Sequence, residues 1–196
     1  YHDVRHLAQC LGALDELALD DLKAPDDVPR VLRLAAWFHD VVYEGVLSEG
    51  VAGEDEEASA RLAEELLTGA GVAPGEVAEV ARLVRVTAAH DPAPDDAAGA
   101  LLVDADLSVL ALPRARYHVY LRDVRLDYAH VPDAAFTAGR RAVVAGWLAR
   151  VAAGATLYRT ATGRRLWEDA ARRNLAEELA RAGPGGVDAA TVGPCD

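Results

Sequence analysis

The chain has 196 residues, enough for one domain with a sizeable core, and its 52% hydrophobic and 27% charged residues are typical of a globular protein. Its formal net charge of −12 argues against nucleic acid and anionic membranes as partners, because that charge repels both. No apolar run is long enough to span a bilayer and no signal peptide opens the chain.

Two cysteines, Cys10 and Cys195, are present, and neither belongs to a CxxC pair. They therefore predict neither a disulfide framework nor a thiolate zinc site, and we expect a cytoplasmic protein. Because the sequence does not open with Met, we also expect further residues before Tyr1 in the native protein.

Apolar residues recur every three or four positions along nearly the whole chain, which predicts an all-α fold, a helical bundle of about eight helices. The first predicted helix carries leucines at this spacing from 7 to 17. Pro29 suits the first turn of the second, whose apolar side runs from 31 to 42. A Gly-rich acidic loop is expected over about 44–54.

Asp55 is the expected cap of the third helix, which ends at Gly69 and Gly71. Pro74 opens the fourth, and the Asp- and Pro-rich stretch 91–96 breaks the pattern.

The fifth predicted helix spans about 97–110 and the sixth about 117–128, and a long seventh follows Pro132. The eighth spans about 162–182. Its predicted core-facing residues are Leu166, Ala170 and Leu179. Residues 1–182 thus form one predicted domain, and the Gly- and Pro-rich segment 183–196 is a predicted flexible tail.

Three of these segments carry imidazole or carboxylate groups where a core is expected. His2 and His6 lie four residues apart in the first segment, His39 and Asp40 adjoin at the end of the second helix, and Asp104 and Asp106 interrupt an apolar run. Burying such groups is costly unless a cation compensates. A mixed histidine and carboxylate set suits Mn, Mg, Fe, Co, Ni or Zn. The alternative is that these are solvent-exposed or internally satisfied polar residues.

The ordered set of His6, the doublet His39-Asp40, and Asp106 resembles the H…HD…D signature of the HD-domain phosphohydrolase superfamily. Other segments are similar to a bacterial family known mainly as predicted metal-dependent HD phosphohydrolases, and the likeness covers residues 1–182. These segments are Ala36–Tyr43, Asp55–Ala60, Thr87–His90, Asp104–Leu107 and Ala171–Leu175.

The resemblance implies an HD-domain-like bundle in which His6, His39, Asp40 and Asp106 bind a divalent metal ion. Asp106 is preferred to Asp104 because the last carboxylate of the signature usually follows a small residue. Asp104 is left as a partner of the ligands.

A count of histidines indicates one metal ion rather than two. Dinuclear HD sites, including the di-iron oxygenases of the superfamily, generally recruit two further histidines between the doublet and the last Asp. Only His90 lies between Asp40 and Asp106 in this chain. A mononuclear site is therefore expected, and the oxygenase reading is less favoured.

The opening segment 1–6, YHDVRH, resembles the YHN-x-x-H opening of cyclic-nucleotide phosphodiesterases, which share the HD core. That likeness implies that His2 donates a proton to the leaving oxygen, although Asp3 stands where those enzymes have Asn. His2 lies one helical turn from His6, on the same face. The alternative is an exposed histidine near the end of the chain.

Two further roles remain to be filled at such a site. Glu57 is a candidate base or water-orienting group, although acidic residues also favour helix starts through the dipole. Arg5, or another arginine that faces the site, and His90 are candidates to hold phosphate oxygens. His90 could equally be a histidine favoured by the helix C-terminus.

These residues together predict metal-dependent hydrolysis of a small phosphate ester. The resemblance to the HD superfamily implies a nucleotide as the substrate class. Phosphomonoesterase and phosphodiesterase activities both remain open, as does assembly into a homo-oligomer. The alternatives are a catalytically silent HD domain that binds a nucleotide as a regulatory module, and an HD-type oxygenase.

Overall fold

The computed structural model describes residues 1–21, 29–43 and 53–181, and throughout these ranges the regular structure is helical. This confirms the all-α fold. The α-helices are α1 (Val4–Asp21), α2 (Arg30–Phe38), α3 (Glu54–Gly69), α4 (Pro74–Thr87), α5 (Ala97–Asp106), α6 (Arg114–Asp127), α7 (Asp133–Ala152) and α8 (Ala161–Arg181), and a 3₁₀ helix, η2 (Leu107–Ala111), follows α5. Within the described residues, no helix has the length and apolar character that crossing a membrane requires.

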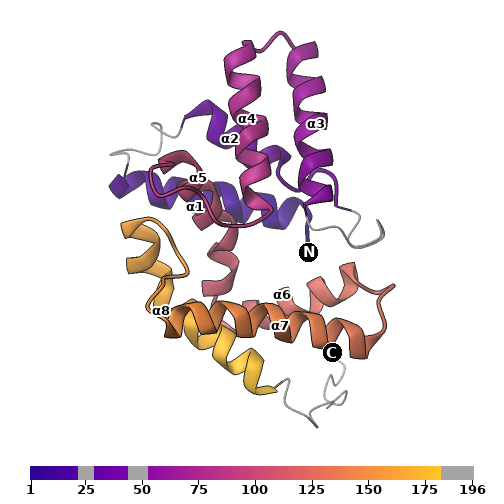
Figure 1. Ribbon diagram of the computed structural model, residues 1–196, viewed down its shortest axis with the longest axis vertical. Coiled ribbons are helices and arrows are strands. Elements are labelled where there is room, and N and C mark those ends of the chain that lie inside the picture. The colour runs from indigo at the N-terminus through magenta and orange to yellow at the C-terminus, as the bar shows by residue number, and fades with distance from the viewer. Residues whose placement is uncertain (22–28, 44–52, 182–196) are drawn as a thin grey trace, which may run out of the picture.

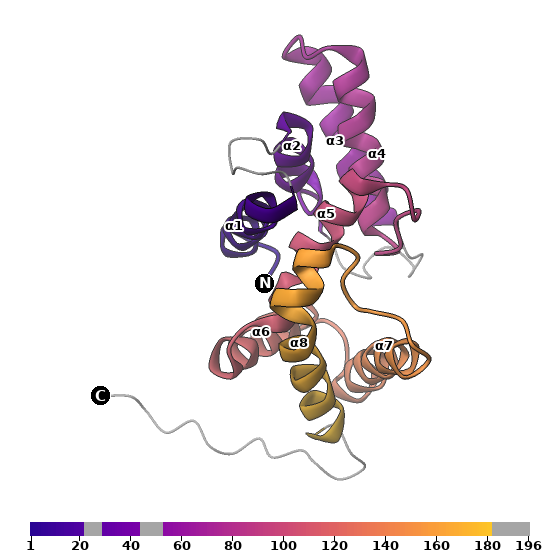
Figure 2. The same ribbon diagram turned by 90° about the vertical axis from the view of Figure 1, so that its left-hand side faces the viewer.

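The helices form two groups joined through α1, α5 and η2. Helices α3 and α4 pack side by side and extend to one end of the molecule (Figure 1). At the other end α8 lies between α6 and α7 (Figure 2). Helix α1 packs on α5 and α2 in the middle, and η2 packs on α8. The ends of α1, α2 and α5 therefore meet near the centre of the bundle.

Two helix ends in the first half differ from the sequence prediction. Helix α2 ends at Phe38 instead of continuing to residue 42, and Trp37 and Val41 are exposed. Helix α3 begins at Glu54, and its cap is Gly53 rather than Asp55. Gly53 has a φ of +92°, a left-handed conformation that glycine adopts without a Cβ clash. Most of the predicted loop at 44–54 lies outside the described residues.

The second half also departs from the prediction in two details. The predicted fifth helix tightens after Asp106 into the 3₁₀ helix η2, a common ending of α-helices. The core face of α8 is formed by Trp167, Ala171 and Leu175, whereas Leu166 is exposed. Of the predicted core-facing residues, Leu179 packs against the core and Ala170 is half-buried, so the prediction was wrong for Leu166. Apolar residues lie on two faces of α8, and packing against η2 chooses between them. The predicted tail 183–196 lies outside the described residues.

Candidate metal centre

The four residues predicted as metal ligands lie together. One ligand atom each from His6, His39, Asp40 and Asp106 lies within 4.8 Å of all the others. His6 comes from the first turns of α1, His39 caps the C-terminus of α2, and Asp106 is the last residue of α5. Segments far apart in sequence thus form a group that could hold a metal ion.

The spacing of these atoms fits a shared cation. His6 Nε2 lies 3.0 Å from His39 Nε2, 3.1 Å from Asp40 Oδ2 and 3.1 Å from Asp106 Oδ1. His39 Nε2 lies 3.0 Å from Asp40 Oδ2 and 3.5 Å from Asp106 Oδ1. Neighbouring ligands at about 2.1 Å from one ion, in tetrahedral or octahedral geometry, lie about 3.0–3.4 Å apart.

The outer nitrogens of both imidazoles have partners that fix the rings. His39 Nδ1 lies 2.9 Å from the Ala36 carbonyl oxygen, which can only accept, so Nδ1 carries a proton. Neutral His39 therefore turns a bare Nε2 lone pair to the centre, the form that binds a metal. His6 Nδ1 lies 2.6 Å from the Tyr1 hydroxyl. Both histidines are buried, at 3% and 2% exposure for His6 and His39.

The electrostatics of the group also favour a cation. Burial lowers the pKa of His39, but hydrogen bonds that the ring donates to the Asp106 and Asp40 carboxylates outweigh burial and hold that pKa well above its usual value. The same balance raises the pKa of His6. In return, the two histidines lower the pKa of Asp106 against the effect of burial. The centre therefore attracts positive charge, which protons supply in the absence of a metal.

The backbone that follows His39-Asp40 is held by Ser59, a residue to which the sequence assigned no role. Ser59 is fully buried on α3. Its hydroxyl accepts from the Val42 backbone N–H at 3.0 Å and donates to the Val42 carbonyl at 3.2 Å. This clamp holds the turn just after Asp40. A serine inside a helix gives no local signal of such a role.

His90 lies beside the group, as the sequence suggested. It follows α4 with a φ of +49°, a left-handed conformation that costs energy in a residue with a Cβ. The turn directs His90 Nε2 to within 2.9 Å of Asp106 Oδ2, the carboxylate oxygen that does not face His6. His90 therefore both orients Asp106 and borders the space in front of the centre.

A cavity of about 190 Å³ opens onto the group. Its polar wall includes Asp40, Asp106 and His90, and its other walls include aromatic rings. These rings belong to Tyr1, Tyr43, Tyr120 and Trp147. The cavity combines polar groups with planar aromatic surfaces, as small-molecule sites commonly do.

His2 lies in the wall of this cavity and is separate from the ligand group. Its ring stacks on Tyr43, with centroids 3.5 Å apart, and its Nδ1 lies 3.0 Å from Asp127 Oδ2. Burial lowers the pKa of His2, and the nearby Asp40 and Asp127 offset this only in part. Asp127, at the C-terminal end of α6, is a partner that the sequence analysis missed.

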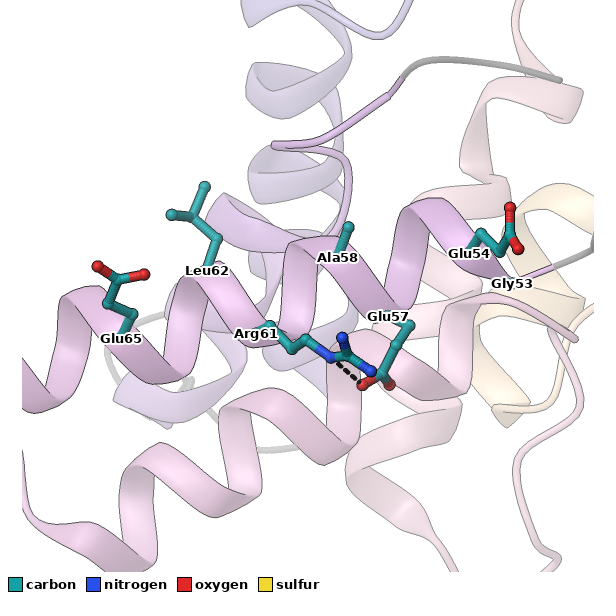
Figure 3. Close-up of a pocket in the computed structure, with 7 residues that line it drawn as sticks. All are labelled: Gly53, Glu54, Glu57, Ala58, Arg61, Leu62 and Glu65. Carbon is teal, nitrogen blue, oxygen red and sulfur yellow. Dashed lines mark hydrogen bonds and ion pairs between the residues drawn. The ribbon is translucent and has the colours of Figure 1, made fainter. Parts of the chain in front are cut away.

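Glu57 does not face the cavity, so this prediction was wrong. Its carboxylate forms ion pairs with Arg61 at 2.8 Å and Arg85 at 2.6 Å, which lower its pKa to about 2. Figure 3 shows Glu57 and Arg61 on the same side of α3, in an open surface hollow. Neighbouring residues of a helix point about 100° apart, and it is Glu56 that lines the cavity.

Arg5 also lies apart from the cavity, which corrects its predicted phosphate contact. Its exposed guanidinium pairs with Asp3 at 2.8 Å and with Asp123 at 3.0 Å. Arg5 directly precedes His6, so the turn of α1 that buries His6 points Arg5 toward solvent.

Asp104 is buried but lies outside the ligand group. It accepts hydrogen bonds from the Arg159 N–H at 2.7 Å, the Thr160 N–H at 2.8 Å and the Thr160 hydroxyl at 2.7 Å. A Cβ at Gly163 would lie 2.5 Å from Asp104 Oδ2, so this approach requires glycine. Asp104 thus anchors the start of α8 rather than supporting a ligand.

Comparison with known proteins adds no family to this picture. A scan against protein-family models and searches of curated proteins and of solved structures found no match. The case for a function therefore rests on the side chains described above.

Proposed function

We propose that this protein is a metal-dependent phosphohydrolase of the HD type that acts on a small phosphate ester. The observation that carries the proposal is the convergence of His6, His39, Asp40 and Asp106 at the end of a cavity. The order of these residues in the sequence is that of the H…HD…D signature, so geometry and sequence pattern support the same assignment.

The four ligands would hold one divalent cation, whether Mn, Mg, Fe, Co, Ni or Zn, since their nitrogen and oxygen donors suit each of these ions. When bound, such an ion polarises a phosphoryl oxygen and lowers the pKa of a bound water. The fixed Nδ1 proton of His39 and the buried position of both imidazoles keep this donor set in place.

His2 is proposed to protonate the leaving oxygen. It borders the cavity, and its ring centroid lies 5.9 Å from that of His6. Asp127 and Tyr43 fix the orientation of the ring, so that Nε2 is the nitrogen left for the substrate. Histidine is the side chain that titrates closest to neutral pH, which suits it to this proton transfer, and the Asp127 carboxylate stabilises the protonated ring against burial, which lowers its pKa.

Two more residues have proposed roles in the cavity. His90 would donate to a phosphate oxygen, because it borders the cavity beside Asp106. Glu56, rather than Glu57, would accept a proton from the attacking water or orient it. The rings of Tyr120 and Trp147 provide surfaces for a planar group, which supports a nucleotide as the substrate class.

The test is metal analysis of protein purified without chelator, followed by a screen of nucleotides and other phosphorylated metabolites. We expect a bound divalent metal and the release of phosphate, or of a nucleoside monophosphate from a diester. Matched monoester and diester substrates separate the two activities. Nucleotide binding without turnover would instead support a silent regulatory domain, and iron with oxygen uptake would support an oxygenase.

A further inference from the structure

A second, narrower pocket adjoins the cavity of the candidate metal centre. It has a volume of about 20 Å³, and four residues line both spaces: His90, Leu107, Leu110 and Trp147. A space of this size holds about one water molecule or one oxygen atom of a larger group. The narrow pocket therefore extends the cavity past His90.

Two arginines line this extension, Arg150 from α7 and Arg159 from the segment before α8. Both contact a single carboxylate, that of Asp91, at 3.8 Å from Arg150 and 2.5 Å from Arg159. Asp91 is 60% exposed, so it is a weak counter-ion. Two guanidinium groups thus share one solvated carboxylate.

Three other arginines of the chain each contact two carboxylates. Arg82 contacts two carboxylates, those of Glu79 and Asp96. Arg85 and Arg5 each contact two as well. Arg114 and Arg181 also share one carboxylate, that of Glu177, but Arg150 and Arg159 are the pair that lines the pocket beside the cavity.

Arg159 also has a buried donor without an acceptor. Among the buried side-chain nitrogen and oxygen atoms of the described residues, only Arg159 Nε is found without a hydrogen-bond partner. A buried N–H is normally satisfied, so an orphaned one beside a pocket indicates a missing acceptor. Guanidinium N–H groups match the oxygens of phosphate and carboxylate.

The backbone around Arg159 is held in place by two buried carboxylates. Glu168 accepts from the N–H groups of Leu157 at 3.0 Å and Tyr158 at 3.2 Å. Asp104 accepts from the N–H groups of Arg159 at 2.7 Å and Thr160 at 2.8 Å. Four consecutive backbone donors are thus fixed, which orders the segment that carries Arg159 before any ligand binds.

We propose that Arg150 and Arg159 form an anion subsite that receives a second phosphoryl group of the substrate, away from the one at the metal centre. The inference rests on the proposed function and narrows its substrate class to phosphate esters with at least two phosphoryl groups. One oxygen of the second group enters the narrow pocket, and the group displaces Asp91 from the arginines.

The test uses three probes: adenosine 5′-monophosphate, adenosine 5′-diphosphate and adenosine 3′,5′-bisphosphate. Each is titrated calorimetrically into the metal-loaded chain carrying His2→Ala, which slows turnover during the measurement. We expect at least one doubly phosphorylated probe to bind about tenfold or more tightly than the monophosphate. The diphosphate and the 3′,5′-bisphosphate distinguish adjacent from separated phosphoryl groups.

Variants then test whether the tighter binding of the doubly phosphorylated probe depends on the subsite. Arg159→Gln and Arg150→Gln should each reduce it about tenfold while leaving monophosphate binding unchanged. Asp91→Asn removes the competing carboxylate and should tighten binding of the doubly phosphorylated probe about threefold. Arg61→Gln, which removes one positive charge on the outer face of α3, is the matched control and should change neither.

A folding defect cannot make the arginine variants bind the doubly phosphorylated probe more weakly and the Asp91 variant bind it more tightly. If Arg159→Gln does not fold, Arg159→Lys replaces it and tests whether a positive charge at this position is sufficient for binding. Equal binding of all three probes by the chain with its arginines intact would overturn the subsite. So would an advantage that survives in both arginine variants. Phosphate ester hydrolysis without arginine dependence would remove the subsite and leave the proposed function. Arginine-dependent binding without hydrolysis would leave the subsite and remove the proposed function.

Discussion

Two buried polar clusters in this protein differ in how their charges are balanced. Between α6, α7 and α8, the Glu178 carboxylate accepts from Arg140 Nε at 2.7 Å, Arg140 Nη2 at 3.1 Å and the Tyr117 hydroxyl at 2.5 Å. Arg140 also lies over the Tyr120 ring, 5.5 Å from its centroid. Each donor faces an acceptor, and the two formal charges cancel.

The candidate metal centre reaches such a balance only when both imidazoles are protonated or a metal ion is bound. Two carboxylate oxygens and two imidazole Nε2 atoms are directed at one another, and His39 already uses its Nδ1–H to donate a hydrogen bond to the Ala36 carbonyl. Neutral imidazoles would leave four acceptors around one point, so either protons on the imidazoles or a metal ion must supply positive charge. A cluster whose donors and acceptors are all paired with one another, such as that of Arg140, Tyr117 and Glu178, stabilises the fold. A cluster of acceptors that lacks a positive charge instead indicates a site for a bound cation.

The largest expected effect is the loss of metal from the centre. His39→Ala should abolish both bound metal and activity, because it removes a ligand that the other three cannot replace. His118→Ala, a histidine substitution on α6 away from the cavity, is the matched control and should keep both. Metal content by elemental analysis gives the readout. A full equivalent of metal in His39→Ala would contradict the ligand assignment.

The next effect concerns His2, which borders the centre without joining it. His2→Ala should retain metal while turnover falls about 10²–10⁴-fold, the usual contribution of a positioned acid. The loss should shrink for substrates with a nitrophenolate leaving group, which needs little protonation. Asp127→Asn should give a smaller loss, since it only loosens the ring. Equal losses for good and poor leaving groups would exclude the acid role, and loss of metal would make His2 a ligand.

Removing the metal should lower the melting temperature. A ligand present at about 100 times its Kd stabilises the native state by about 2.7 kcal/mol. For a chain of this size that corresponds to about 5–11 °C. Differential scanning calorimetry with and without chelator measures the shift. An unchanged melting temperature after verified removal of the metal would mean that the centre does not need a cation.

The same shift should depend on pH. In the metal-free chain the pKa values of His39 and His6 are raised, so their contribution to stability is full below about 6.5 and is lost as pH rises through the raised values. Metal binding needs both imidazoles unprotonated and strengthens with pH. The stabilisation by metal should therefore grow from pH 6 to pH 9, and a constant or shrinking difference would argue against histidine ligands.

The smallest effect is expected in the cluster of Arg140, Tyr117 and Glu178. Tyr117→Phe removes one hydrogen bond to the Glu178 carboxylate and should cost about 1.5 kcal/mol of stability. The melting temperature should fall by about 3–6 °C. Metal content and its dependence on pH should stay unchanged. A change in either would mean that the two clusters are coupled and that the contrast between them is not valid.

Much of this architecture could be predicted from the sequence because its signals are local. Apolar spacing of three and four residues predicted the helices, and Pro74 and Pro132 correctly marked two of their starts. His39-Asp40 and Asp106 stood out as polar residues in apolar surroundings, a contrast that burial makes costly and that therefore indicates a compensating ligand. These features predicted the fold class and part of the candidate centre, whereas His6 and the choice of Asp106 over Asp104 followed from the resemblance to the H…HD…D signature.

Only the tertiary structure decided which side chains face the cavity. Sequence reasoning chose Glu57 and Arg5, whereas Glu56 lines the cavity and Arg150 and Arg159 line its extension. It also missed Asp127, which reaches His2 from α6. Consecutive helical residues point about 100° apart, so of two neighbours such as Glu56 and Glu57 one can line the cavity while the other faces solvent. The direction of each helix face depends on what packs against it, and those partners lie far away in the sequence.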